Sequence, residues 1–255
     1  MNFMEVIRHA RMPIAKKLVK KGTIKLAVVE TTPIVWHDKL LRFEWIRNNN
    51  WGKFEGVTQD EGFYHFIDMS NEEEIGKPFA FNHSFGCSYT EDNVVYCHGT
   101  RGNGGGNVLD VFWSDDLENW KSKEILKFPK DIELYNTSVC KDENGYIMAI
   151  EIGGDNPIVG VPYTIIFAKS QNLLDWELLP TDKHIFSQER YTACPSIRYY
   201  DGYYYIVYLE TAPYYRSLPY IVRSKDLIEF EPGIRNPVLM FPDEDKKNFV
   251  SRKIQ

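Results

Sequence analysis

Apolar and aromatic residues in this chain fall in short runs separated by polar or glycine-containing turns, a pattern typical of β-strands joined by hairpins. Asn144-Gly145 separates two such runs, and Asp201-Gly202 separates two others. These dipeptides supply the positive-φ positions that a two-residue hairpin turn requires. We therefore expect a chain built from antiparallel strands.

The same arrangement recurs in four units, each of which opens with a hairpin and continues into a third strand. The expected hairpins span residues 32–44, 85–98, 137–151 and 195–210, and the expected third strands span 63–68, 108–113, 163–168 and 220–223.

A motif of the form Ser-x-(Asp/Asn)-Leu-x-x-(Trp/Phe) follows the third strand in three of the units. Its copies begin at Ser114, Ser170 and Ser224, which are 56 and then 54 residues apart. The Ser and Asp or Asn side chains are suited to capping a tight turn, while the Leu and the aromatic residue anchor that turn. A period near fifty residues in a β pattern indicates the blades of a propeller.

We therefore expect an all-β fold, a β-propeller of four-stranded antiparallel blades, with residues 1–22 as an N-terminal leader or cap and residues 23–255 as a single propeller domain. The residues after Glu231 are too few for another unit of this length. Either the fold has four blades, or the last blade of a five-bladed propeller is incomplete in this chain. An N-terminal strand, a second chain in an oligomer or a missing segment beyond Gln255 would have to complete it, because an open blade edge invites aggregation.

The three copies of this motif and the segment from Cys194 to Tyr205 resemble sequences of the five-bladed propeller glycoside hydrolases of families 43 and 32 and their relatives. These relatives include arabinanases, xylosidases and fructosidases. The resemblance spans about Thr23 to Pro232 and implies glycosidase activity. Those families carry an acidic Glu two residues before a Pro that corresponds to Pro195, where this chain has Ala193. They also open the first blade with Asp-Pro, which is absent here. Any activity must therefore use carboxylates at other positions.

Composition and charge narrow the range of partners. The net charge is −6 and the pI is about 5.6, so the chain lacks the basic footprint of a nucleic-acid-binding protein. No apolar run approaches the roughly 20 residues of a membrane-spanning helix. The segment Met1 to Gly22 is basic but has no apolar core of a secretory signal, so we expect a cytoplasmic protein without membrane contact.

Cysteine spacing gives no indication of a metal or cofactor site. Cys87, Cys97, Cys140 and Cys194 form neither a C-x-x-C pair nor a zinc-type Cys/His pattern. Cys87 and Cys97 flank one expected hairpin turn and can face each other there, but buried free thiols are the favoured interpretation. The cysteine pattern does not exclude a calcium ion bound on the propeller axis.

Carboxylates recur where the blades are expected to converge. In an antiparallel hairpin, the start of the first strand and the end of the second strand lie at the same edge. Glu44, Glu151 and Glu210 end three of the second strands, and Glu30 precedes the first strand of the first unit. We predict Glu151 and Glu210 as an acid/base pair and Glu30 as a third carboxylate that tunes it. The alternative for each is exposure to solvent or pairing with a local arginine such as Arg42.

Residues around the same edge are suited to binding a carbohydrate. Aromatic faces stack on sugar rings, and Asn, Asp, Glu and Arg bond to hydroxyl or carboxylate groups. Arg101 and Arg216 can in addition pair with a uronate. The substrate-binding candidates are Glu44, Trp45, His83, Arg101, Asn136, Asp155, Tyr191, Tyr214 and Arg216.

The favoured interpretation is a glycoside hydrolase that cleaves a poly- or oligosaccharide by carboxylate acid/base catalysis in the central mouth of the propeller, without a cofactor. A non-catalytic carbohydrate-binding propeller is the first alternative, and a protein-interaction scaffold is the second. Carboxyl groups that converge on one cavity favour hydrolysis, whereas a flat apolar rim favours the scaffold.

Overall fold

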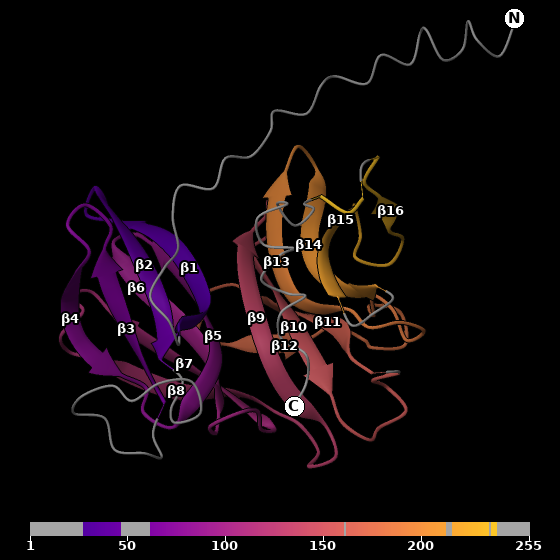
Figure 1. The fold of residues 1–255 in the computed structure, drawn as a ribbon, viewed down its shortest axis with the longest axis horizontal. Coiled ribbons are helices and arrows are strands. Elements are labelled where there is room, and N and C mark those ends of the chain that lie inside the picture. The colour runs from indigo at the N-terminus through magenta and orange to yellow at the C-terminus, as the bar shows by residue number, and fades with distance from the viewer. Residues whose placement is uncertain (1–27, 47–61, 161, 213–215, 235, 239–255) are drawn as a thin grey trace, which may run out of the picture.

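The computed structural model describes residues 28–46, 62–160, 162–212, 216–234 and 236–238. These residues form sixteen strands and no helix, so within them there is also no helix that could cross a membrane. The strands form four antiparallel four-stranded sheets, each of which follows the order of the chain. The expected all-β propeller is thereby confirmed (Figure 1).

Each sheet is one blade, numbered here in chain order. Blade 1 comprises β1 (Val28–Trp36), β2 (Lys39–Ile46), β3 (Phe63–Asp68) and β4 (Glu73–Phe79). Blade 2 comprises β5 (His83–Glu91), β6 (Val94–Arg101), β7 (Val108–Ser114) and β8 (Lys121–Lys127). Blade 3 comprises β9 (Glu133–Lys141), β10 (Tyr146–Gly153), β11 (Thr164–Ser170) and β12 (Trp176–Leu178). Blade 4 comprises β13 (Ala193–Tyr200), β14 (Tyr203–Ala212), β15 (Arg216–Ser224) and β16 (Glu231–Pro232).

The first strand of each blade is the innermost one. In the described part of the chain, β1 packs beside β5, β5 beside β9 and β9 beside β13, whereas β13 makes no comparable contact with β1. The ring of inner strands is therefore open between blade 4 and blade 1, as the separation of β1 and β13 in Figure 1 illustrates.

The blade count differs from the five-bladed type that the resemblance implied. The described residues form four blades, and those of them that follow Glu231, up to Val238, do not start a fifth. Glu231–Pro232 instead serves as the outer strand of blade 4. Gly233 and Val238 then donate backbone hydrogen bonds to Ile221 and Pro219 of the same blade. The described tail residues thus complete blade 4, while residues 239–255 and the expected closure by an N-terminal strand from residues 1–27 lie outside the described residues.

The repeated motif forms the turn between the third and fourth strands of blades 2, 3 and 4, as expected. The Oγ atoms of Ser114, Ser170 and Ser224 accept a hydrogen bond from the backbone N–H of the following leucine at 2.9, 2.9 and 2.8 Å. Trp120, which ends the first copy, stacks on Phe79 with ring centroids 3.6 Å apart. This tryptophan therefore lies between blades and away from the central axis.

Apolar clusters between neighbouring blades hold the propeller together. Phe43 and Cys97 belong to the cluster between blades 1 and 2, whereas Cys87 belongs to that between blades 2 and 3. The two cysteines therefore point to opposite faces of blade 2 and do not face each other. Cys87, Cys97 and Cys140 are buried, Cys194 is half-buried, and none of the four forms a disulfide within the described part of the chain.

Irregular strand pairing marks one end of the inner strands. The register shifts between Val29 and Thr31 in β1, between Ser84 and Cys87 in β5, and between Ala193 and Ser196 in β13. Bulges of this kind re-aim side chains and are common beside functional sites. The end of the propeller at which β5, β9 and β13 begin, called the mouth here, is therefore the place to look for chemistry.

Candidate functional site at the mouth of the propeller

A central cavity of about 220 Å³ opens between the four inner strands. Its lining includes Thr31 and Thr32 of β1, Asn136 of β9, and Cys194 and Arg198 of β13. A second cavity of about 380 Å³ is lined by residues of the same four strands nearer their other ends. Because strands of every blade contribute, both cavities lie along the propeller axis.

Glu151 lies directly behind the wall of the first cavity. Its carboxylate atom Oε2 accepts a hydrogen bond of 2.7 Å from Nδ2 of Asn136 and one of 2.8 Å from the backbone N–H of Cys194. The residue is 4% exposed. Burial raises the pKa of Glu151, and the two hydrogen bonds offset only part of this effect.

Glu151 differs from the other buried carboxylates in its partners. Glu44, Asp68, Asp110 and Glu151 are the buried carboxylates among the described residues. The first three each contact a lysine, an arginine or a histidine. Within the described ranges, Glu151 has no such cation beside it. It is therefore suited to hold a proton, as a general acid must.

Glu210 lies near the end of β14, the second strand of blade 4, as Glu151 lies near the end of β10 in blade 3. It accepts a hydrogen bond of 3.2 Å from the hydroxyl of Tyr208, a residue of the apolar cluster between these two blades. Nε of Arg190 lies 3.6 Å from its carboxylate. The next residue along the chain, Tyr191, has its pKa raised by burial and then by the charge of Glu151. The segment before β13 thus contacts one predicted carboxylate with Arg190 and approaches the other with Tyr191.

The side chains of three predicted site residues lie outside the described part of the chain. Glu30 lies in β1 at the register shift, so its backbone is at the mouth, and Arg216 begins β15 opposite Ala212. The side chains of Glu30 and Arg216 lie outside the described part, and so does all of Tyr214. Asp155 is exposed in the loop that follows β10.

Glu44 belongs to a separate ionic cluster on blade 1. Its carboxylate receives hydrogen bonds from Nε of Arg42 at 2.6 Å and from Nε2 of His65 at 2.9 Å. Burial alone would raise the pKa of Glu44, but these partners lower it below its usual value. Burial alone would lower the pKa of His65, but hydrogen bonds to Glu44 and Glu74 raise it. Pairing with the local arginine, the alternative considered for strand-end glutamates, therefore applies at this position.

His83 and Arg101 are brought together, but not with Glu151. Both bond to Asp110, with His83 Nε2 at 2.8 Å from Oδ2 and Arg101 Nη2 at 2.7 Å from Oδ1. Arg101 also approaches Glu124 at 3.1 Å. This arginine is thus neutralised by two carboxylates on blade 2 and is poorly suited to pair with a uronate.

An arc of aromatic rings follows the mouth across three blades and the segment before β13. It runs from Trp45 through Phe85, Tyr135 and Tyr163 to Tyr191, with successive ring centroids 4.8, 5.1, 5.2 and 5.4 Å apart. Trp45 is 1% exposed and supports the arc from within, whereas the other four rings are half-buried. Only the two ends of this arc were predicted from the sequence. The other three rings, of Phe85, Tyr135 and Tyr163, could have been found as aromatic residues next to the start of an inner or third strand.

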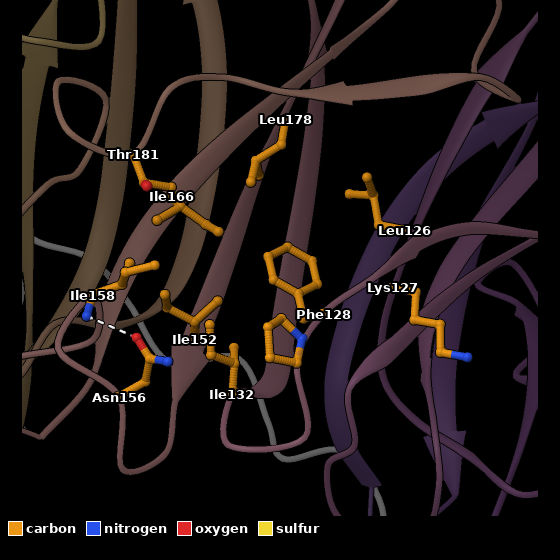
Figure 2. A pocket seen from close by; sticks show the side chains of 11 residues that line it. Leu126, Lys127, Phe128, Ile132, Ile152, Asn156, Ile158, Ile166, Leu178 and Thr181 are labelled. Atoms are coloured by element: carbon orange, nitrogen blue, oxygen red, sulfur yellow. Dashed lines mark hydrogen bonds between the residues drawn. The ribbon is translucent and has the colours of Figure 1, made fainter.

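A third cavity, of about 280 Å³, lies between blades 2 and 3 (Figure 2). Its wall is mainly apolar, and the ring of Phe128 projects into it beside Ile152, Ile166 and Leu178 (Figure 2). Lys127 is the one ionisable residue in this lining. The cavity therefore offers no carboxylate for acid/base chemistry. Among the described residues, no group of three or more His, Cys, Asp and Glu side chains is placed to hold a metal ion.

No family model matches the chain, and no curated protein matches its sequence. Solved structures do share its shape. The BT0996 protein, solved as a complex with RGII, has a TM-score of 0.60 and 15% identity over 84% of this chain and 75% of its own. The α-L-arabinofuranosidase of Fusarium graminearum, solved with an iminosugar inhibitor, has a TM-score of 0.58 and 12% identity over 82% of this chain and 67% of its own.

A glycosyl hydrolase from Bacteroides ovatus is also similar, with a TM-score of 0.56 and 11% identity over 83% of this chain and 71% of its own. Identities this low carry information on the fold and not on the chemistry, because one fold hosts many activities. The likeness therefore shows that this chain has a propeller fold that glycoside hydrolases also have.

Proposed function

We propose that the protein is a glycoside hydrolase that cleaves a poly- or oligosaccharide at the mouth of the propeller. The observation that carries this proposal is Glu151, a buried carboxylate with a raised pKa that lies beside a central cavity and has no cationic partner among the described residues. A glycosidase needs one carboxyl group that stays protonated until it transfers its proton to the glycosidic oxygen.

The position of Glu151 also compensates for the missing family acid. The resembled hydrolases carry that acid at the position of Ala193, at the start of β13. Here the carboxylate of Glu151, from β10 of the neighbouring blade, bonds to the backbone N–H of Cys194, the residue that follows Ala193. Asn136 fixes its orientation from β9. The acid is thus supplied by a different blade at a similar location.

Glu210 is the best-placed partner for this acid. It lies near the end of the second strand of the next blade, its side chain is 22% exposed, and Nε of Arg190 lies 3.6 Å from its carboxylate. We assign the role of base or nucleophile to Glu210. Two carboxyl groups in different surroundings can therefore divide the acid and base roles. Glu30 keeps its proposed role as a tuning carboxylate at the start of β1.

The aromatic arc supports a sugar as the substrate. Half-buried rings of Tyr135, Tyr163 and Tyr191 follow the rim next to the proposed acid. Aromatic rings pack against the C–H faces of sugars, and phenol hydroxyls bond to sugar hydroxyls.

The low exposure of Glu151 favours one second candidate, a non-catalytic carbohydrate-binding propeller. In this candidate, the carboxylate of Glu151, which is 4% exposed, holds the bulged backbone at Cys194 and takes no part in chemistry. Both candidates bind glycans, but only the first requires the glutamates for turnover.

A glycan hydrolysis panel separates the two candidates. The wild-type protein, Glu151→Gln and Glu210→Gln would be incubated with neutral and acidic oligosaccharides, and released reducing ends would be measured. Glu189→Gln is a matched control because Glu189 is exposed in the same segment as Arg190 and Tyr191. We expect hydrolysis by the wild type and the control, and losses of about 10²- to 10⁴-fold in the other two variants. Glycan binding by the wild type without hydrolysis of any panel member would contradict the proposal and favour the binding protein.

A further inference from the structure

Arg198 is a cation in the centre of the propeller that has no part in the proposed acid/base chemistry. It lies in β13 and contributes to the lining of both axial cavities. Its side chain is exposed, and its hydrogen bond is to the adjacent backbone carbonyl of Ile197 at 2.6 Å. No carboxylate of the described ranges lies within ion-pair distance of its guanidinium.

The positive charge of Arg198 affects the pKa of two cysteines on other blades. Burial raises the pKa of Cys87 in β5 to about 11 and that of Cys140 in β9 to about 12. In both cases the charge of Arg198 acts in the opposite direction. These small effects on inner strands of blades 2 and 3 agree with the place of Arg198 in the linings of both axial cavities.

Hydroxyl groups surround the same space. Thr31, Thr32 and Ser196 line the first cavity beside Arg198. Within the described part of the protein, these three hydroxyls make no hydrogen bond to other residues. The cavity thus offers one unpaired cation and three available hydroxyls, although the whole chain has a net charge of −6. A guanidinium fork of this kind matches the two oxygens of a carboxylate.

We propose that Arg198 binds the carboxylate of an acidic sugar and that the substrates are uronate-containing glycans. The inference rests on the proposed function in one respect, since it takes the axial cavity as part of the substrate site. Asn136 and Cys194 line this cavity together with Arg198 and also bond to Glu151. A sugar whose carboxylate reaches Arg198 is therefore held in the same cavity whose wall contacts the proposed acid.

The sequence favoured Arg101 and Arg216 for this task, and Arg101 lacks these properties. Arg101 forms two hydrogen bonds with Asp110 and approaches Glu124, so its charge is already compensated. Arg198 was overlooked because it lies within an inner strand and not in a loop.

Binding measurements test this inference independently of turnover. Calorimetric titrations would compare galacturonate with galactose, glucuronate with glucose, and inorganic sulfate as a further anion. The proteins are the wild type, Arg198→Gln, Arg198→Lys and Arg223→Gln. Arg223 is a matched control because it is exposed on the same blade and already pairs with Glu231.

We expect the uronates to bind more tightly than the neutral sugars, and Arg198→Gln to weaken uronate binding by about 10- to 100-fold, since a charged hydrogen-bonded pair is lost. Arg198→Lys should recover only part of this affinity, and Arg223→Gln should behave as the wild type. Equal binding of uronate and neutral sugar, or uronate binding unchanged in Arg198→Gln, would overturn the inference. Sulfate that binds as tightly as the uronates would also overturn it, because the site would then be a general anion site.

Binding and hydrolysis by the wild type together distinguish this inference from the proposed function. Uronate binding that depends on Arg198, combined with no hydrolysis of any glycan by the wild-type protein, would support the acidic-sugar site and refute the hydrolase. Hydrolysis confined to neutral glycans and insensitive to Arg198→Gln would support the hydrolase and refute the acidic-sugar site.

Discussion

The backbone N–H of Cys194 donates a hydrogen bond of 2.8 Å to the carboxylate of Glu151. This bond joins the first strand of blade 4 to the second strand of blade 3. Cys194 has a φ of 51° at the register shift of β13, so its amide is turned out of the strand pairing and bonds to the neighbouring blade instead. The bulge and the buried carboxylate thus depend on each other.

The first prediction concerns the pH dependence of stability. The pKa of Glu151 is raised in the folded protein, so the folded state binds more protons than the unfolded state above the ordinary value of 4.5. The contribution of this group is then fully present below about pH 4.5 and is lost as the pH rises through its folded pKa. In Glu151→Gln this loss should be absent. Urea unfolding at about pH 4, 5.5 and 7 would test it, and we expect the variant to gain stability relative to the wild type as the pH rises.

A second prediction concerns Glu44, a buried carboxylate whose pKa is lowered by its cationic partners. Glu44 is 2% exposed and is bonded to Arg42 and His65. Replacing one member of a buried ion pair leaves the other without compensation and costs about 3–5 kcal/mol. We expect Glu44→Gln to lower the free energy of unfolding by about this amount and to leave glycan turnover per folded molecule unchanged.

The exposed pair between Lys77 and Glu118 provides the control for this prediction. Their side chains are 69% and 45% exposed, and such surface pairs contribute less than about 1 kcal/mol. Glu118→Gln should therefore have little effect on urea unfolding. If Glu44→Gln were equally mild, the cluster on blade 1 would not be a stabilising feature.

A third prediction concerns the repeated turns. Ser170 accepts a hydrogen bond of 2.9 Å from the backbone N–H of Leu173, which is 1% exposed. Ser170→Ala would leave this buried donor without its partner and should cost about 1–3 kcal/mol. Ser122→Ala, at an exposed position in β8, should leave thermal unfolding almost unchanged. Equal unfolding temperatures of the two variants would contradict the proposed role of the turn.

These turns also show which part of the structure was predictable from sequence. The bonds of Ser114, Ser170 and Ser224 join residues three positions apart, so they depend on a local pattern that a sequence displays directly. The hairpin turns at 144–145 and 201–202 are local for the same reason. Repetition of such local units made the propeller predictable.

The candidate site was less predictable because its contacts join distant residues. The bond between Glu151 and Cys194 spans 43 positions, and that between His65 and Glu44 spans 21 positions. Both glutamates follow apolar runs at the ends of second strands, yet one is paired with cations and the other is not. The four repeated units matched the four observed blades, whereas the resemblance to five-bladed hydrolases implied a different number.

The pH dependence of hydrolysis tests the central role of Glu151 most directly. The substrate found in the glycan panel would be used to measure kcat/KM from about pH 3 to 9 for the wild type, Glu151→Gln and the control Glu189→Gln. We predict that wild-type activity falls on the alkaline side as a group with a pKa above 4.5 loses its proton. Glu151→Gln should lack this alkaline limb and lose about 10²- to 10⁴-fold in kcat/KM, while the control should follow the wild type. An unchanged profile in Glu151→Gln, with wild-type kcat/KM, would contradict the proposed role of this carboxylate.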